Sequence, residues 1–197
     1  MDPVQPGFPM RVRTMRRGLF LLLVLLPGLA VGQTPSEKRA AAEKLLETLR
    51  NAPNTDVAGA LEARIQQLWV DGSTAAVTLL MHRGLRELQG GSHDAAIAAF
   101  SDAIVLDPTL AEAWHQRGVA RYQGGDTPGA VVDLQETLKR EPRSFAAWKT
   151  LAEIAAARED WTGAYGAWRK LMEIDPKTPN GDERLRELKR KAVGEDT

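Results

Sequence analysis

Three prolines, Pro108, Pro142 and Pro176, lie 34 residues apart, and an alanine lies twelve residues before each of them. A fixed period of this length marks a chain built from repeated supersecondary units, each of which buries its apolar face only against its neighbours. The sequence therefore predicts a stack of similar units, in which a surface rather than a catalytic cleft carries the function.

The repeat divides the chain into three units, residues 77–110, 111–144 and 145–178. Within each unit, apolar residues recur at three- and four-residue spacing, and turn residues interrupt the pattern once near the middle and once at the proline. This pattern predicts two helices of about fourteen residues per unit. Each unit is therefore expected to be an antiparallel helical hairpin.

A glycine occupies the same column of the first two units, as Gly84 and Gly118. Glycine inside a helix costs about 1 kcal/mol relative to alanine. Its presence at two equivalent sites predicts that the two helices of a hairpin cross closely there, with a large side chain of the second helix filling the space.

These columns resemble the tetratricopeptide repeat (TPR), whose pattern is W-x2-L-G-x2-Y, then A-x3-F-x2-A, then P. The middle unit matches it at Trp114, Gly118, Ala130, Leu134 and Pro142, and the other two units match at equivalent columns. The resemblance implies an all-α solenoid of stacked antiparallel hairpins. It also implies that the first helix of each unit lines a concave face.

The seventh column departs from the pattern, because Arg83 and Arg117 replace leucine. We expect Arg117 to bridge its own hairpin to Asp133 while its aliphatic stem covers apolar surface. The alternative is that the two arginines form a pair for an anionic ligand.

The N-terminus predicts a secretory signal peptide over residues 1–32, with cleavage between Gly32 and Gln33. The apolar stretch of about fifteen residues is shorter than the roughly 20 that span a bilayer. Export to the periplasm is therefore expected, and an uncleaved anchor in the inner membrane is the alternative. Met15 could itself begin a compact signal. The basic residues that precede the apolar run are Arg11, Arg13, Arg16 and Arg17.

Charge and composition exclude several function classes. Removal of residues 1–32 takes away four arginines and one aspartate, which leaves 22 basic and 25 acidic residues, so a nucleic-acid partner is not expected. The chain has no cysteine, and hence neither a disulfide nor a cysteine-linked lipid anchor. It also lacks metal-site and phosphate-loop motifs, so we expect no metal, no cofactor and no enzymatic activity.

The flanks of the repeats predict further helices. Residues 33–76 read as a degenerate helical hairpin that lacks the alanine and proline columns, and we expect it to cap the N-terminal end of the stack. Residues 179–197 read as a charged C-terminal capping helix and tail, with Leu185 and Leu188 as its apolar edge.

In this repeat class the second, fifth, ninth and twelfth columns of the first helices face the groove. Methionine, leucine and tyrosine in such positions offer adaptable contact for an extended or helical peptide. The alternative is that Leu85, Leu88 and Val119 only pack against each other or the preceding hairpin. The candidate partner-binding residues are Met81, Leu85, Leu88, Glu112, His115, Val119, Tyr122, Lys149 and Glu153.

The chain as a whole resembles the small exported TPR proteins of the Gram-negative envelope. The resemblance implies a non-catalytic adaptor or scaffold whose partner is a protein or peptide, with membrane contact only through an uncleaved signal. Two alternatives stay open, a membrane-anchored envelope assembly factor and an accessory subunit of an envelope enzyme complex.

Overall fold

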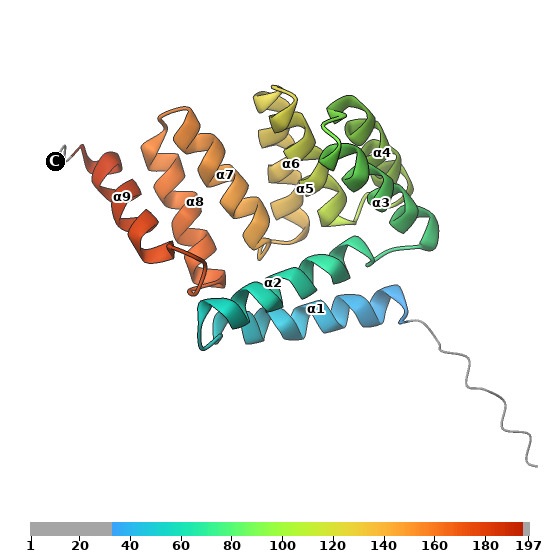
Figure 1. Cartoon of the computed structure of the whole chain (residues 1–197), viewed down its shortest axis with the longest axis horizontal. Helices are drawn as coiled ribbons and strands as arrows, with labels where there is room; N and C mark the ends of the chain where they lie inside the picture. The colour runs from blue at the N-terminus through green and yellow to red at the C-terminus, as the bar shows by residue number, and fades with distance from the viewer. Residues whose placement is uncertain (1–32, 195–197) are drawn as a thin grey trace, which may run out of the picture. The chain divides into compact units, whose positions relative to one another are not determined.

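The computed structural model describes residues 33–194, which form nine α-helices and no strand (Figure 1). The segment for which we predict a signal peptide, residues 1–32, lies outside the described residues. None of the described helices is long and apolar enough to cross a membrane.

The helices follow one another with short connections. In chain order they are α1 (Pro35–Arg50), α2 (Thr55–Val70), α3 (Ala75–Gln89), α4 (His93–Leu106), α5 (Ala111–Gln123), α6 (Thr127–Arg140), α7 (Phe145–Ala157), α8 (Trp161–Ile174) and α9 (Gly181–Val193).

The helices α3 to α8 form three consecutive hairpins that pack side by side, α3 with α4, α5 with α6 and α7 with α8 (Figure 1). Within the last two hairpins an aspartate caps the second helix. Asp126 accepts a hydrogen bond of 2.9 Å from the Gly129 N–H, and Asp160 accepts one of 2.9 Å from the Gly163 N–H. The predicted all-α solenoid of stacked antiparallel hairpins is confirmed.

The close approach predicted at Gly84 is present in the first hairpin. A Cβ atom added at Gly84 would lie 2.5 Å from the ring of Phe100, which is fully buried. At Gly118 the same atom would lie 3.2 Å from the carbonyl oxygen of Ala130 and 3.3 Å from Leu134. The missing side chain therefore lets the second helix of each hairpin approach the first.

Each repeat ends in a turn made by an acidic residue and a proline. Asp107, Glu141 and Asp175 precede the three prolines, and each side chain accepts a hydrogen bond from the N–H group two residues later, at distances of 3.1, 2.9 and 3.1 Å. This local bond fixes the backbone where the proline prevents the helix from continuing.

A tryptophan near the start of the next helix also contacts each of the first two turns. Trp114 donates its indole N–H to the carbonyl oxygen of Pro108 at 3.1 Å, and Trp148 donates to that of Pro142 at 2.9 Å. The first two turns therefore have the same geometry and are made by the same residue types, 34 residues apart.

The α1–α2 hairpin does not take the end-capping position that we expected from the sequence. It runs across the ends of the repeat helices where the proline turns lie, and it contacts α3, α5 and α8 (Figure 1). The physical reason is that its charged and aromatic side chains have their partners at and beside these turns. At the other end, α9 packs on α8 and buries Leu188.

Two glycine-to-alanine substitutions should have opposite effects on stability. Gly84→Ala places a methyl group against the buried Phe100 ring, and we expect it to lower the free energy of unfolding by about 1–3 kcal/mol. Gly59→Ala on α2 meets no atom within 4 Å and should raise it by about 0.5–1 kcal/mol. Urea unfolding of both variants measures this. Equal effects of the two changes would contradict the close crossing.

Candidate peptide-binding surface

The first proline turn is held by the α1–α2 hairpin through polar contacts. Ser73 donates its hydroxyl to Asp107 at 2.5 Å, and Arg39 of α1 lies 3.6 Å from the same carboxylate. Partial burial raises the pKa of Asp107, but hydrogen bonds from Ser73 and Thr109 and the charge of Arg39 outweigh it, so the pKa lies below its usual value. Asp107 is therefore an anion that fixes the hairpin to the turn.

The second turn is held by reversed charges. Arg143, which follows Pro142, pairs with Glu43 and, at 2.8 Å, with Glu47 of α1. Arg39, Glu43 and Glu47 are spaced four residues apart, which places them on one face of α1. That face lies along the first two turns.

The third turn meets α2 through two carboxyl groups. Asp175 is fully buried, and its Oδ2 atom has no amide, hydroxyl or cationic donor among the described residues. Burial and the adjacent Asp175 together raise the pKa of Glu62 to about 7, although the charge of Lys149 opposes the shift. A protonated Glu62 can donate the hydrogen bond that Asp175 otherwise lacks.

Apolar contacts join the hairpin to the third repeat. The rings of Trp69 and Phe145 stack with their centroids 5.5 Å apart, at the start of α7. Leu46, Leu49 and Ile65 are buried in one cluster with side chains of α7, α8 and α9. The hairpin is therefore part of the folded core, because both its polar and its apolar side chains have partners on the repeats.

Docking of the α1–α2 hairpin leaves some of the predicted groove residues buried and others accessible. The residues nearest the proline turns, Met81, Glu112 and His115, are buried. Glu112 accepts hydrogen bonds from Gln116 at 2.6 Å and from His115 Nδ1 at 3.3 Å. These three candidates from the sequence are not accessible to a partner. The reason is that α2 crosses the start of α5 and packs into one buried cluster with α3 and α5.

The other predicted groove residues remain accessible. Four apolar or aromatic residues toward the far ends of α3 and α5 are half-buried: Leu85, Leu88, Val119 and Tyr122. In the third repeat Lys149 and Glu153 are exposed on α7. We call the four apolar residues the open row.

Arg117 makes the bridge that we expected from the sequence. Its guanidinium donates to both carboxylate oxygens of Asp133, at 2.9 and 2.7 Å, and its remaining nitrogen donates to Ser101 of the preceding repeat at 3.1 Å. Arg121 also lies 2.9 Å from the buried Asp133. Arg117 is thus occupied by the fold, which contradicts its use as half of an anion-binding pair.

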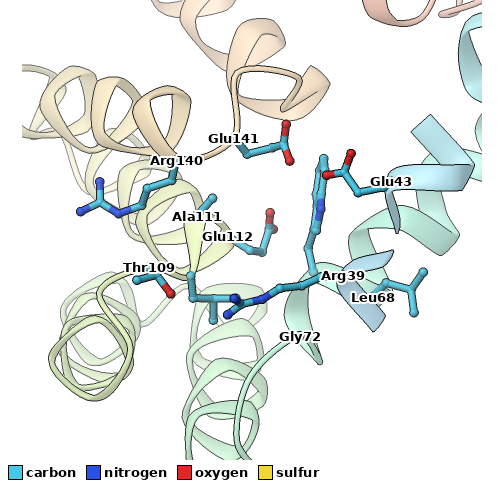
Figure 2. Close-up of a pocket in the computed structure, with 11 residues that line it drawn as sticks. Arg39, Glu43, Leu68, Gly72, Thr109, Ala111, Glu112, Arg140 and Glu141 are labelled. Carbon is cyan, nitrogen blue, oxygen red and sulfur yellow. The ribbon is translucent and has the colours of Figure 1, made fainter. Parts of the chain in front are cut away.

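A cavity of about 220 Å³ lies between the hairpin and the first two turns (Figure 2). Glu43, Glu112 and Glu141 line it, and the guanidinium of Arg140 points away from them. Burial raises the pKa of Glu141 despite the opposing charge of Arg143. The sequence did not predict this cavity, because its walls come from α1, α2 and two different repeats. The four-residue spacing of charges on α1 was the one signal that a charged surface lay opposite.

The arrangement of α3 to α8 defines an α-solenoid of helical hairpins. A family profile described as "TPR repeat" matches residues 84–125, and one described as "Tetratricopeptide repeat" matches residues 115–179. Residues 84–179 of the chain therefore match tetratricopeptide repeats. A comparison with curated proteins gives no match.

Solved TPR structures share the fold. The first TPR of Spaghetti (RPAP3) bound to the HSP90 peptide SRMEEVD is 16% identical, with 61% of this chain and 96% of that chain covered and a TM-score of 0.57. The TPR2B domain of yeast Sti1 in its pHsp70 complex is 18% identical, with 62% and 100% covered and a TM-score of 0.54. MamA is 19% identical, with 81% and 88% covered and a TM-score of 0.53.

The carboxyl pair predicts how stability changes with pH. Folding raises the pKa of Glu62 from 4.5 to about 7. The protonated Glu62 side chain therefore stabilises the fold fully below about pH 4.5, and this stabilisation is lost as the pH rises through about 7. Glu62→Gln, which keeps a donor at every pH, should match the unchanged chain near pH 5 and exceed its stability near pH 8.

Thermal unfolding across this range measures the effect. Glu153→Gln, an exposed carboxylate on α7, is the matched control and should follow the unchanged chain throughout. Parallel pH profiles for the unchanged chain and Glu62→Gln would show that the two carboxyl groups do not share a proton.

Proposed function

We propose that this chain is a non-catalytic adaptor that binds a protein or peptide through the open row of its first two TPR units. The observation that carries the proposal is that Leu85, Leu88, Val119 and Tyr122 stay partly exposed, whereas the candidates nearest the proline turns in the same two repeats are buried. Aliphatic and aromatic side chains on adjacent helices suit an apolar stretch of an extended or helical peptide.

The bound peptides of the solved relatives support a peptide partner in general. They include an HSP90 peptide and the pHsp70 partner of the TPR2B domain. The peptide SRMEEVD is acidic, whereas the groove of this chain carries Glu153 and, as a single exposed cation among the candidate residues, Lys149. We therefore propose an apolar segment as the target rather than an acidic C-terminus.

The place of action is the second part of the proposal. The basic, apolar and small-residue segments of residues 1–32 support export to the periplasm of a Gram-negative envelope, followed by cleavage after Gly32. A retained signal would instead make the chain a membrane-anchored assembly factor. An accessory subunit of an envelope enzyme complex would use the same exported domain.

Binding through the open row is tested by capture of partners from an envelope extract. Leu85→Glu and Tyr122→Glu should each reduce recovery of a specific partner at least about tenfold, because they place a charge in an apolar contact. Val132→Glu on α6 is the control, since Val132 is exposed outside the open row. The peptide SRMEEVD should not compete. Recovery that is insensitive to both open-row changes contradicts the proposed surface.

Export is tested by N-terminal sequencing of the chain recovered from a Gram-negative host. Cleavage predicts a first residue of Gln33 in the periplasmic fraction. A chain that begins at Met1 or Met15 and sediments with membranes would replace the periplasmic adaptor by the anchored alternative.

A further inference from the structure

The α3–α4 hairpin ends the stack, and its outer side is not covered by another repeat. In the second and third repeats the third column holds Ala113 and Ala147, which are fully buried against the preceding hairpin. The equivalent residue of the first repeat is Leu79, which is 67% exposed. The α1–α2 hairpin lies along the proline turns and leaves this side of α3 open (Figure 1).

Two arginines continue the same face of α3. Arg83 is equivalent to Arg117, whose guanidinium reaches Ser101 on the preceding repeat, and Arg86 is equivalent to the fully buried Ala120. Both arginines are exposed. Leu79, Arg83 and Arg86 follow the i, i+4, i+7 spacing of one helical stripe. This stripe is the part of a repeat that elsewhere in the chain packs on a neighbour.

The adjacent helix α4 presents the complementary chemistry. Val105 is 79% exposed and Leu106 is 59% exposed, near the same end of the hairpin as Leu79. Two exposed acidic residues, Asp94 and Asp102, lie further along α4. The α3–α4 hairpin therefore has exposed apolar residues at one end. Beyond this end, α3 carries basic residues and α4 carries acidic residues.

We propose that two copies of this chain associate through their α3–α4 hairpins, with α3 of each copy against α4 of the other. A two-fold axis along the hairpin makes α3 antiparallel to the partner's α4, since α3 and α4 are themselves antiparallel. A two-fold interface requires a self-complementary patch, which the opposite charges of α3 and α4 supply.

The spacing along the helices fits this pairing. Arg83 lies four residues, about 6 Å, beyond Leu79, and Asp102 lies three residues, about 4.5 Å, before Val105. When Leu79 meets Val105 of the second copy, Arg83 therefore comes opposite Asp102. A partner with an unrelated acidic helix would satisfy α3 but leave the apolar end of α4 exposed, so the second copy accounts for more of the surface.

The test is the oligomeric state of the full chain, purified as the expressing bacterium processes it, measured by sedimentation equilibrium. The unchanged chain should be a dimer. Leu79→Glu and Arg83→Glu should each raise the dimer dissociation constant at least about tenfold, and so should Asp102→Arg. Combining Arg83→Glu with Asp102→Arg should restore the constant to within about threefold of its original value, because the pair is re-formed with reversed charges.

Val132→Glu, on an exposed position of α6, is the control and should leave the dimer unchanged. Circular dichroism should show full helix content in every variant, because all the substituted residues are exposed. A monomeric unchanged chain, a dimer that survives Leu79→Glu, or a reversed pair that stays dissociated each overturns the proposal.

Discussion

The turn made by an acidic residue and a proline is the element on which the remaining structure depends. At Asp107, Glu141 and Asp175 the side chain accepts a local N–H bond, while the proline ends the helix. Because the turns recur every 34 residues, they lie along one side of the stack. That row of charged turns is the surface on which the α1–α2 hairpin docks, through Arg39 at the first turn, Glu43 and Glu47 at the second, and Glu62 at the third.

Docking along the turns has two consequences for the accessible surface. It buries the part of the groove nearest the proline turns in the first two repeats, including Met81 and His115, and leaves the open row accessible. It also leaves the outer side of α3 without the hairpin that would otherwise cap it, so Leu79 is exposed. The placement of the α1–α2 hairpin thus determines both the extent of the candidate peptide-binding surface and the exposure of the outer side of α3.

Much of the fold could be predicted from the sequence because its information is local. The proline turn, the close approach at Gly84 and the pairing of Arg117 with Asp133 each depend on residues within or next to one repeat. The burial of Met81, Glu112 and His115 could not be predicted in the same way, because it depends on α2, which is separate from them in the sequence and outside the repeat pattern. A stripe on a helix specifies which residues share a face but not what covers that face.

By itself the sequence determined that the chain is an α-solenoid of three TPR hairpins with further helices on both sides, since repeated turns and helical periodicity are properties of short segments. Only the tertiary structure decided where the α1–α2 hairpin lies, and therefore which half of the groove is open. The physical reason is that this placement depends on contacts between residues far apart in the sequence, Glu43 with Arg143 and Trp69 with Phe145. A local sequence pattern does not show which distant residues will meet.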